Sequence, residues 1–156
     1  MNLAWHFVGD KLRDGRPIPA DGVWLEHEGP LKMCDSGLHF ARQPFDALSY
    51  ACGATTLCLV EIGGEVVEEK ERKDCDPPPK GIASRRKIIA RHDIAAFCDL
   101  KKDLEDARLA ACAAISDKAA NEAWEAIWDN ARKKFNASVY EAFKDHMLTR
   151  ANTEHP

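Results

Sequence analysis

Residues 55–69 read TTLCLVEIGGEVVEE, and this stretch decides the fold of the chain. Its β-branched and aliphatic residues run from Thr55 to Ile62, stop at Gly63-Gly64 and resume at Val66-Val67. Runs of this kind, split by glycines, are typical of a strand that continues beyond a bulge or bend. The body of the protein is therefore expected to contain a β-sheet.

Two more strands and one short helix follow from the surrounding sequence. The apolar runs at 3–8 and 82–89 predict the strands. Pro44 suits the first position of a helix, because its fixed φ is already helical and its missing N–H is not needed there. Apolar residues then recur at helical spacing, and Gly53 can close the segment. We expect a helix over 44–51.

The composition changes near residues 99–103. Gly, Pro and β-branched residues are frequent before this point, whereas Ala and charged residues dominate after it and apolar residues repeat at three and four. Two or three helices are expected, and Ser138 with Glu141 fits a capping box that would begin the last one. The predicted fold class is α+β. A small, mostly antiparallel sheet with a short helix occupies 1–99, and a helical C-terminal extension over 100–150 packs on the body or on a partner.

Length and composition bound the class of protein. The chain has 156 residues, 45% hydrophobic and 31% charged, with a formal net charge of -4. These values suit one domain with a sizeable core and exclude a wholly disordered chain. No apolar run is long enough to span a membrane, and residues 1–10 lack the features of a secretion signal. We expect a soluble, cytoplasmic protein with no membrane partner, whose six cysteines stay reduced.

Basic residues gather in the segment 80–92. Strand alternation would turn Arg85 and Lys87 to one side and Arg86 to the other, so they would not form a continuous basic face. Basic residues on an edge strand also prevent sheet-to-sheet pairing. Because the chain is acidic and carries no recognition motif, nucleic acid is a disfavoured partner.

The densest cluster of reactive side chains lies in residues 34–41, which read CDSGLHFA. His39 stands on an extended segment after a glycine, and Tyr50 stands near the end of the expected helix. Together they would line a pocket in which His39 donates a hydrogen bond and Tyr50 stacks on a planar ring. The alternative is a buried turn in which His39 bonds a backbone carbonyl and Tyr50 fills the core.

No complete catalytic set or metal site stands out. The chain lacks a Gly-x-Ser-x-Gly nucleophile elbow and the short Cys and His spacings of structural zinc sites. We therefore assign no catalytic residue, metal ligand or cofactor from the residues alone. Trp124 and Trp128 share one face of the expected tail, which would pack on the body or contact a partner, since Trp is frequent in both settings.

Three segments carry a resemblance to a known family: 37–41 (GLHFA), 46–53 (DALSYACG) and 57–66 (LCLVEIGGEV). Together with flanking sequence over 6–97, they resemble an uncharacterised family found in bacteria and their phages. Members often carry Ala- and Trp-rich helical tails. The resemblance implies a bacterial or phage origin and brings no activity with it.

The order of these segments is also similar, more remotely, to the nicotinamide-binding core of the ADP-ribosyltransferases. That resemblance implies that His6 holds the nicotinamide ribose and that His39 and Tyr50 enclose the nicotinamide ring. The late-strand glutamate of those enzymes has no counterpart here, because 82–89 offers Arg85 and its neighbours instead. An arginine suits a phosphate-bearing ligand, since its planar guanidinium binds phosphate oxygens in a bidentate manner.

Two functions follow from these observations. The first is a non-enzymatic protein that binds another macromolecule, with inhibition of a host defence complex as one such role. Its protein partner would contact Trp124, Trp128 and Arg86. The alternative is an ADP-ribosyltransferase-like enzyme that uses NAD, or a nucleotide-binding protein with an altered site, formed by His6, His39, Tyr50 and Arg85. The resemblance to an uncharacterised family, the apolar tail and the incomplete catalytic set favour the first, and enzymatic activity is left open.

Overall fold

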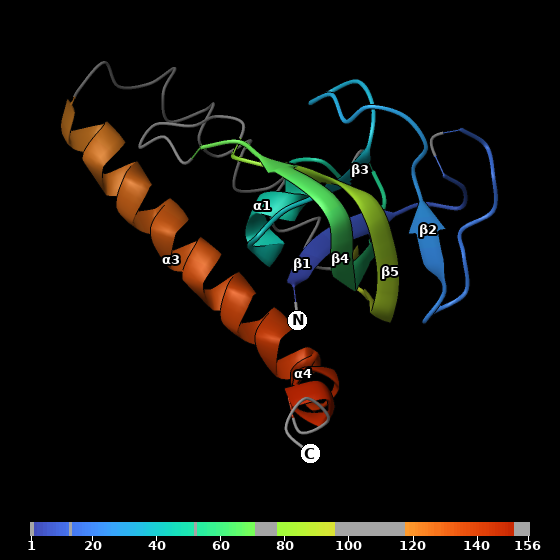
Figure 1. Cartoon of the computed structure of the whole chain (residues 1–156). Helices are drawn as coiled ribbons and strands as arrows, with labels where there is room; N and C mark the ends of the chain where they lie inside the picture. The colour runs from blue at the N-terminus through green and yellow to red at the C-terminus, as the bar shows by residue number, and fades with distance from the viewer. Residues whose placement is uncertain (1, 13, 52, 71–77, 96–117, 152–156) are drawn as a thin grey trace.

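The chain forms an antiparallel sheet with its long helices on one side (Figure 1). The structure is a computed structural model, and it describes residues 2–12, 14–51, 53–70, 78–95 and 118–151, with side chains in the two last helices from 125 to 148. Its elements in chain order are β1 (Leu3–Val8), β2 (Trp24–Glu26), β3 (Leu38–Phe40), α1 (Pro44–Leu48), β4 (Thr56–Glu68), β5 (Gly81–Asp93), α3 (Lys118–Ala142) and α4 (Lys144–Ala151). The α+β class predicted from the sequence is confirmed.

The two long strands β4 and β5 form the centre of the sheet. They pair antiparallel along their lengths. β1 pairs with the edge of β4 that faces away from β5, and β2 and β3 pair with successive parts of the edge of β5 that faces away from β4. The register of β4 on β5 shifts between Gly63 and Val66. Gly64 has φ +71 there, and a Cβ at this position would lie 2.1 Å from Ser84 Oγ. The two apolar runs of residues 55–69 thus form one strand. One of its register shifts lies where the glycines predicted it, and another lies between Leu59 and Val60.

Two predicted elements differ from the observed ones in length. The strand expected at 82–89 extends from Gly81 to Asp93, because it pairs with β4 far beyond its apolar centre. The helix expected over 44–51 ends at Leu48. Single turns follow it, in which the Tyr50 N–H donates to the Ala47 carbonyl at 3.0 Å.

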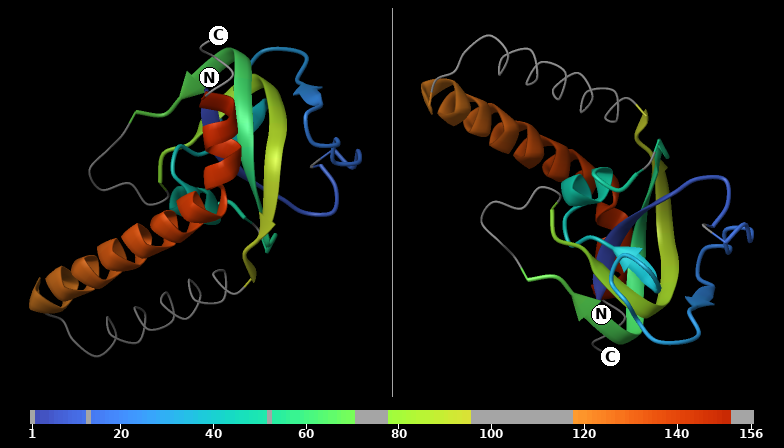
Figure 2. Two further views of the ribbon diagram at one scale, coloured as in Figure 1. Left: turned by 90° about the horizontal axis from the view of Figure 1, so that it is seen from below. Right: turned by 90° about the horizontal axis from the view of Figure 1, so that it is seen from above.

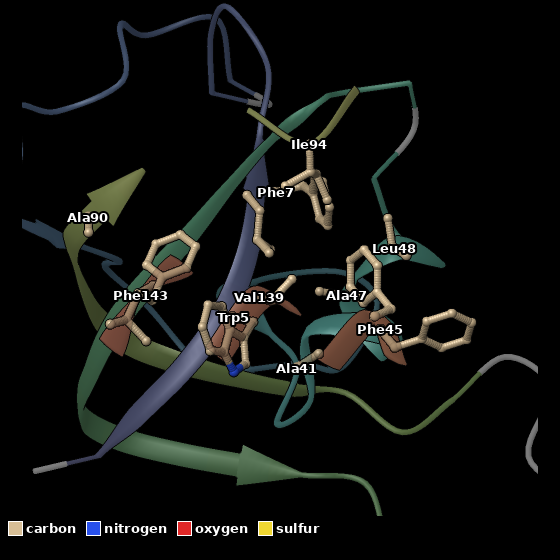
Figure 3. Packing of buried hydrophobic residues seen from close by; sticks show 13 residues of the cluster. Trp5, Phe7, Ala41, Phe45, Ala47, Leu48, Ala90, Ile94, Val139 and Phe143 are labelled. Atoms are coloured by element: carbon tan, nitrogen blue, oxygen red, sulfur yellow. The ribbon is translucent and has the colours of Figure 1, made fainter. Parts of the chain in front are cut away.

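The larger core lies between the sheet and the helices. Strand alternation turns Trp5 of β1 and Leu59 of β4 toward this side, where α1 and the end of α3 cover them. Figure 3 shows Val139 and Phe143 beside Trp5 in this layer. The rings of Trp5 and Phe143 meet edge to face with their centroids 5.1 Å apart. The views in Figure 2 agree that α3 and α4 lie on one side of the sheet and the segment carrying β2 on the other.

The opposite face of the sheet carries a second, smaller apolar cluster. It is built from alternate residues of the central strands and from the end of β3, and its buried members are Ala4, Val8, Phe40, Cys58, Val60, Ile62, Ala83 and Ile88. The long segment between β1 and β3 passes this face, and Ile18 packs against the cluster from that segment. This face therefore lies between the sheet and a loop-rich segment.

Polar contacts fix α3 on α1 in addition to the apolar core. Arg132 donates to the buried carboxylate of Asp46 at 2.6 Å, and the Tyr140 hydroxyl donates to Gln43 Oε1 at 2.8 Å. Burial of apolar surface stabilises the packing of α3, while these polar contacts fix the register of the helix on the body. The described part of the tail thus packs on the body.

The capping box expected at Ser138 does not begin a helix. α3 runs through this position to Ala142, and Ser138 Oγ donates to the Lys134 carbonyl one turn earlier, at 3.0 Å. A serine inside a helix satisfies its hydroxyl in this way when it is not a cap. The interruption between α3 and α4 falls at Phe143, whose ring is buried in the core. Residues 103–117, also expected to be helical, lie outside the described residues. Within the described part of the chain, no helix is both long enough and apolar enough to cross a membrane.

Candidate ligand cavity

A cavity of about 930 Å³ lies beside β1 and β3. Its walls come from β1, the segment after it, the end of β2, residues 34–41 around β3, and the turns after α1. Small-molecule sites are typically about 300–1,000 Å³ in volume. The cavity is therefore large enough to enclose most of a small ligand.

Arg86 contributes a buried positive charge to the cavity wall. It lies on β5 opposite Ile62 of β4 and Leu25 of β2, and only 5% of its surface is exposed. Its Nη1 donates to the His39 carbonyl at 2.5 Å. Burial lowers the pKa of Arg86 to about 10, so the side chain stays charged at neutral pH. Among the described residues, Arg86 has no carboxylate partner.

His6 lies on β1 opposite Cys58 of β4, and it also lines the cavity. Burial lowers the pKa of His6 well below its usual range, and the nearby charges of Arg86 and His39 lower it further. The imidazole is therefore neutral near pH 7 and offers one donor and one acceptor. Burial also raises the pKa of the neighbouring Cys58 thiol to about 11, so this cysteine is not a reactive thiolate.

His39 and Tyr50 border the same cavity from two other elements. His39 stands on β3 opposite Ile82, and its carbonyl accepts the hydrogen bond from Arg86. Tyr50 follows α1, its hydroxyl donates to the carbonyl of Pro78, and Lys80 Nζ lies 4.7 Å from its ring centroid. Residues distant in the sequence thus meet around one space.

The predicted site residues divide between the cavity and the outer surface. His6, His39 and Tyr50 line the cavity, but Arg85 does not. Arg85 points to the other face of β5, where it is paired with Glu26 at 3.0 Å and lies over the ring of Trp24 at 4.7 Å. The cavity contains Arg86 instead, which the sequence had suggested as a partner contact.

The tail tryptophans are placed differently from each other. Trp128 is half-buried on the body, with its ring edge to face on Phe45 at 5.1 Å. The side chain of Trp124 lies outside the described residues. Trp128 therefore belongs to the interface between α3 and α1.

The described carboxylates of the cavity wall are each held by a basic residue. Asp14 accepts from Arg16 Nε at 2.8 Å, Glu26 is paired with Arg85, and Asp35 is paired with Lys32 at 3.0 Å. The hydrogen bonds from Arg16 lower the pKa of Asp14. None of these three carboxylates neutralises Arg86.

Sequence reasoning missed His27, which also lines the cavity. Its Nε2 is buried and has no hydrogen-bond partner among the described residues. His27 follows β2, a strand of three residues, which is too short for alternation to reveal it. No group of three possible metal ligands is assembled in the described part of the chain.

Comparisons with known proteins give a family but no activity. No curated protein and no solved structure matches the chain. A family model described as a domain of unknown function, DUF7666, matches residues 3–100. This range contains every residue that lines the cavity, whereas α3 and α4 follow it. The chain therefore belongs to the DUF7666 family.

Proposed function

We propose that this protein binds a small ligand with a flat ring, a nucleoside or nucleotide, in the cavity. The observation that carries the proposal is that His6, His39 and Tyr50 come from separate elements and line one space of about 930 Å³. Aromatic and imidazole rings are suitable partners for a planar base, because stacking does not depend on a fixed set of hydrogen bonds. Of the functions expected from the sequence, nucleotide binding is thus the one that the geometry supports best.

Binding is favoured over ADP-ribosyl transfer by the state of the carboxylates. Stabilising an oxocarbenium-like transition state calls for an anionic group beside the ribose. The described carboxylates of the wall, Asp14, Glu26 and Asp35, are each engaged by a basic side chain. Incubation with NAD tests this part of the proposal. If the full chain released nicotinamide, the protein would be an enzyme that consumes NAD, and the proposal of binding without turnover would be wrong.

A calorimetric titration of the full chain with adenosine tests binding itself. The wild type is expected to bind, and Tyr50→Ala is expected to weaken binding by about fivefold or more, because stacking on an aromatic ring contributes about 1–3 kcal/mol per base. Tyr50→Phe keeps the ring and is expected to retain most of the affinity. His146→Ala, on the exposed surface of α4, is the matched control for an unrelated ring. A wild type that binds neither adenosine nor adenosine monophosphate would contradict the proposal.

A second function, contact with another macromolecule, is supported by one observation on the tail. Ile127 of α3 is 50% exposed although Trp128 beside it packs on the body. A bacterial or phage protein that inhibits a host defence complex would use such a surface. A stoichiometric partner bound by the wild type and lost in Ile127→Asp would support this function, whereas equal recovery would remove Ile127 from it.

A further inference from the structure

We infer that the cavity contains an oxyanion subsite, centred on the guanidinium of Arg86, that takes the phosphate group of the bound nucleotide. This inference rests on the proposed function and adds where the charged part of the ligand is held. It places the phosphate against β5 and β2, whereas Tyr50 contributes its ring from the turn after α1.

The first argument is the incomplete coordination of Arg86. A guanidinium has five N–H donors, and among the residues that the structure describes Arg86 makes one side-chain hydrogen bond, to the His39 carbonyl. Within the described residues it has no ion pair, although only 5% of its surface is exposed. A buried charge is strongly unfavourable unless an opposite charge compensates it. Its position in the cavity wall lets a ligand provide that charge.

The second argument is the balance of charge around the cavity. The wall carries Lys11 and Lys80 besides Arg86, while its described carboxylates are already paired with other basic residues. Lys80 Nζ lies 4.7 Å from the centroid of the Tyr50 ring and has no ion pair among the described residues. The cavity therefore has a surplus of positive charge and favours an anionic ligand although the whole chain is acidic.

The third argument is that polar imidazoles share the face of Arg86. Leu25 of β2 pairs with Arg86, so their side chains lie on one face, and His27 two residues later continues this face. The buried Nε2 of His27 has no partner among the described residues. His6, kept neutral by burial, can donate one hydrogen bond from β1. A phosphate group offers the acceptors that these groups and the arginine fork require.

The test compares two ligands that differ by the phosphate. Calorimetric titrations of the full chain with adenosine and adenosine monophosphate are run in buffer free of phosphate. The wild type is expected to bind the monophosphate about tenfold or more tightly than adenosine, since a hydrogen bond to a charged group contributes about 1.5–3 kcal/mol. Arg86→Met is expected to bring this ratio close to one and to leave adenosine binding in place. Arg91→Met is the matched control, because Arg91 lies on the same strand outside the cavity, its partner Asp21 also lies outside it, and the ratio should therefore be kept.

Each outcome decides between the subsite and the binding function. A wild type that binds both ligands equally overturns the subsite but not the binding function. A ratio that survives in Arg86→Met places the phosphate elsewhere and also overturns it. If the wild type binds neither adenosine nor adenosine monophosphate, both the subsite and the binding function are overturned. If Arg86→Met does not fold, Arg86→Gln carries the same comparison, and inorganic phosphate against chloride at equal ionic strength should raise the melting temperature of the wild type only.

Discussion

Replacing Arg86 by methionine is expected to stabilise the protein in the absence of ligand. Burial lowers the pKa of Arg86 to about 10, more than two units below the ordinary value of an arginine. The side chain is charged at pH 7 in both the folded and the unfolded chain, so this shift means that the charged form destabilises the fold by about 3 kcal/mol, at about 1.4 kcal/mol per pKa unit. The hydrogen bond to the His39 carbonyl offsets about 1–2 kcal/mol of this. Methionine removes both, and the expected net gain in the free energy of unfolding is about 1–2 kcal/mol.

Urea unfolding of the full chain, followed by circular dichroism in phosphate-free buffer, measures this gain. A gain of that size should raise the melting temperature by about 2–8 °C in a chain of this length. Arg85→Met should lower the free energy of unfolding by about 1 kcal/mol or less, because Arg85 is exposed and its pair with Glu26 and its contact with the Trp24 ring are each weak. A loss of more than about 1 kcal/mol in Arg86→Met would refute the reasoning, since it would show that the wild-type fold depends on this charge.

Three other predictions concern pH, the tail and the sheet. Burial lowers the pKa of His6, so only the unfolded chain takes up a proton at this residue as the pH falls below about 6.5. The free energy of unfolding should then drop by up to about 1.4 kcal/mol per pH unit. Urea unfolding at several pH values checks this, because His6→Gln should show a flatter dependence on pH. Phe143→Ala should lower the free energy of unfolding by about 3–5 kcal/mol, and a thermal melt showing little change would argue against docking of the tail. In Gly81→Ala the new Cβ would lie 2.1 Å from Phe40 Cζ, so unfolding should become easier by about 1–3 kcal/mol, whereas the closest contact in Gly63→Ala is an ordinary 3.4 Å.

The main strands could be predicted because their signals are local. Leu3–Val8 is a strand with the same bounds as its apolar run. The glycines at 63–64 marked one register shift in β4, since the backbone at Gly64 has a positive φ and leaves no room for a Cβ. Pro44 correctly marked the start of α1. In each case, the residues that determine the structure stand within the element itself.

The cavity needed long-range information that the sequence does not display. Alternation indicated that Arg85 and Arg86 face opposite sides of a strand, but the pairing of β5 with β2 decides which of them is enclosed. That strand has three residues and carries too little pattern to be recognised. His27 was missed for the same reason. At Ser138 the capping pattern was present, but packing of the residues around it continued α3 through that position.

An experimental structure of the full chain with adenosine monophosphate would test the central claim most directly. We expect the phosphate within hydrogen-bond distance of the Arg86 guanidinium and the base beside Tyr50 and His39, inside the cavity. A nucleotide bound on the outer surface of the sheet, or in the cavity with its phosphate turned away from Arg86 toward solvent, would contradict the account.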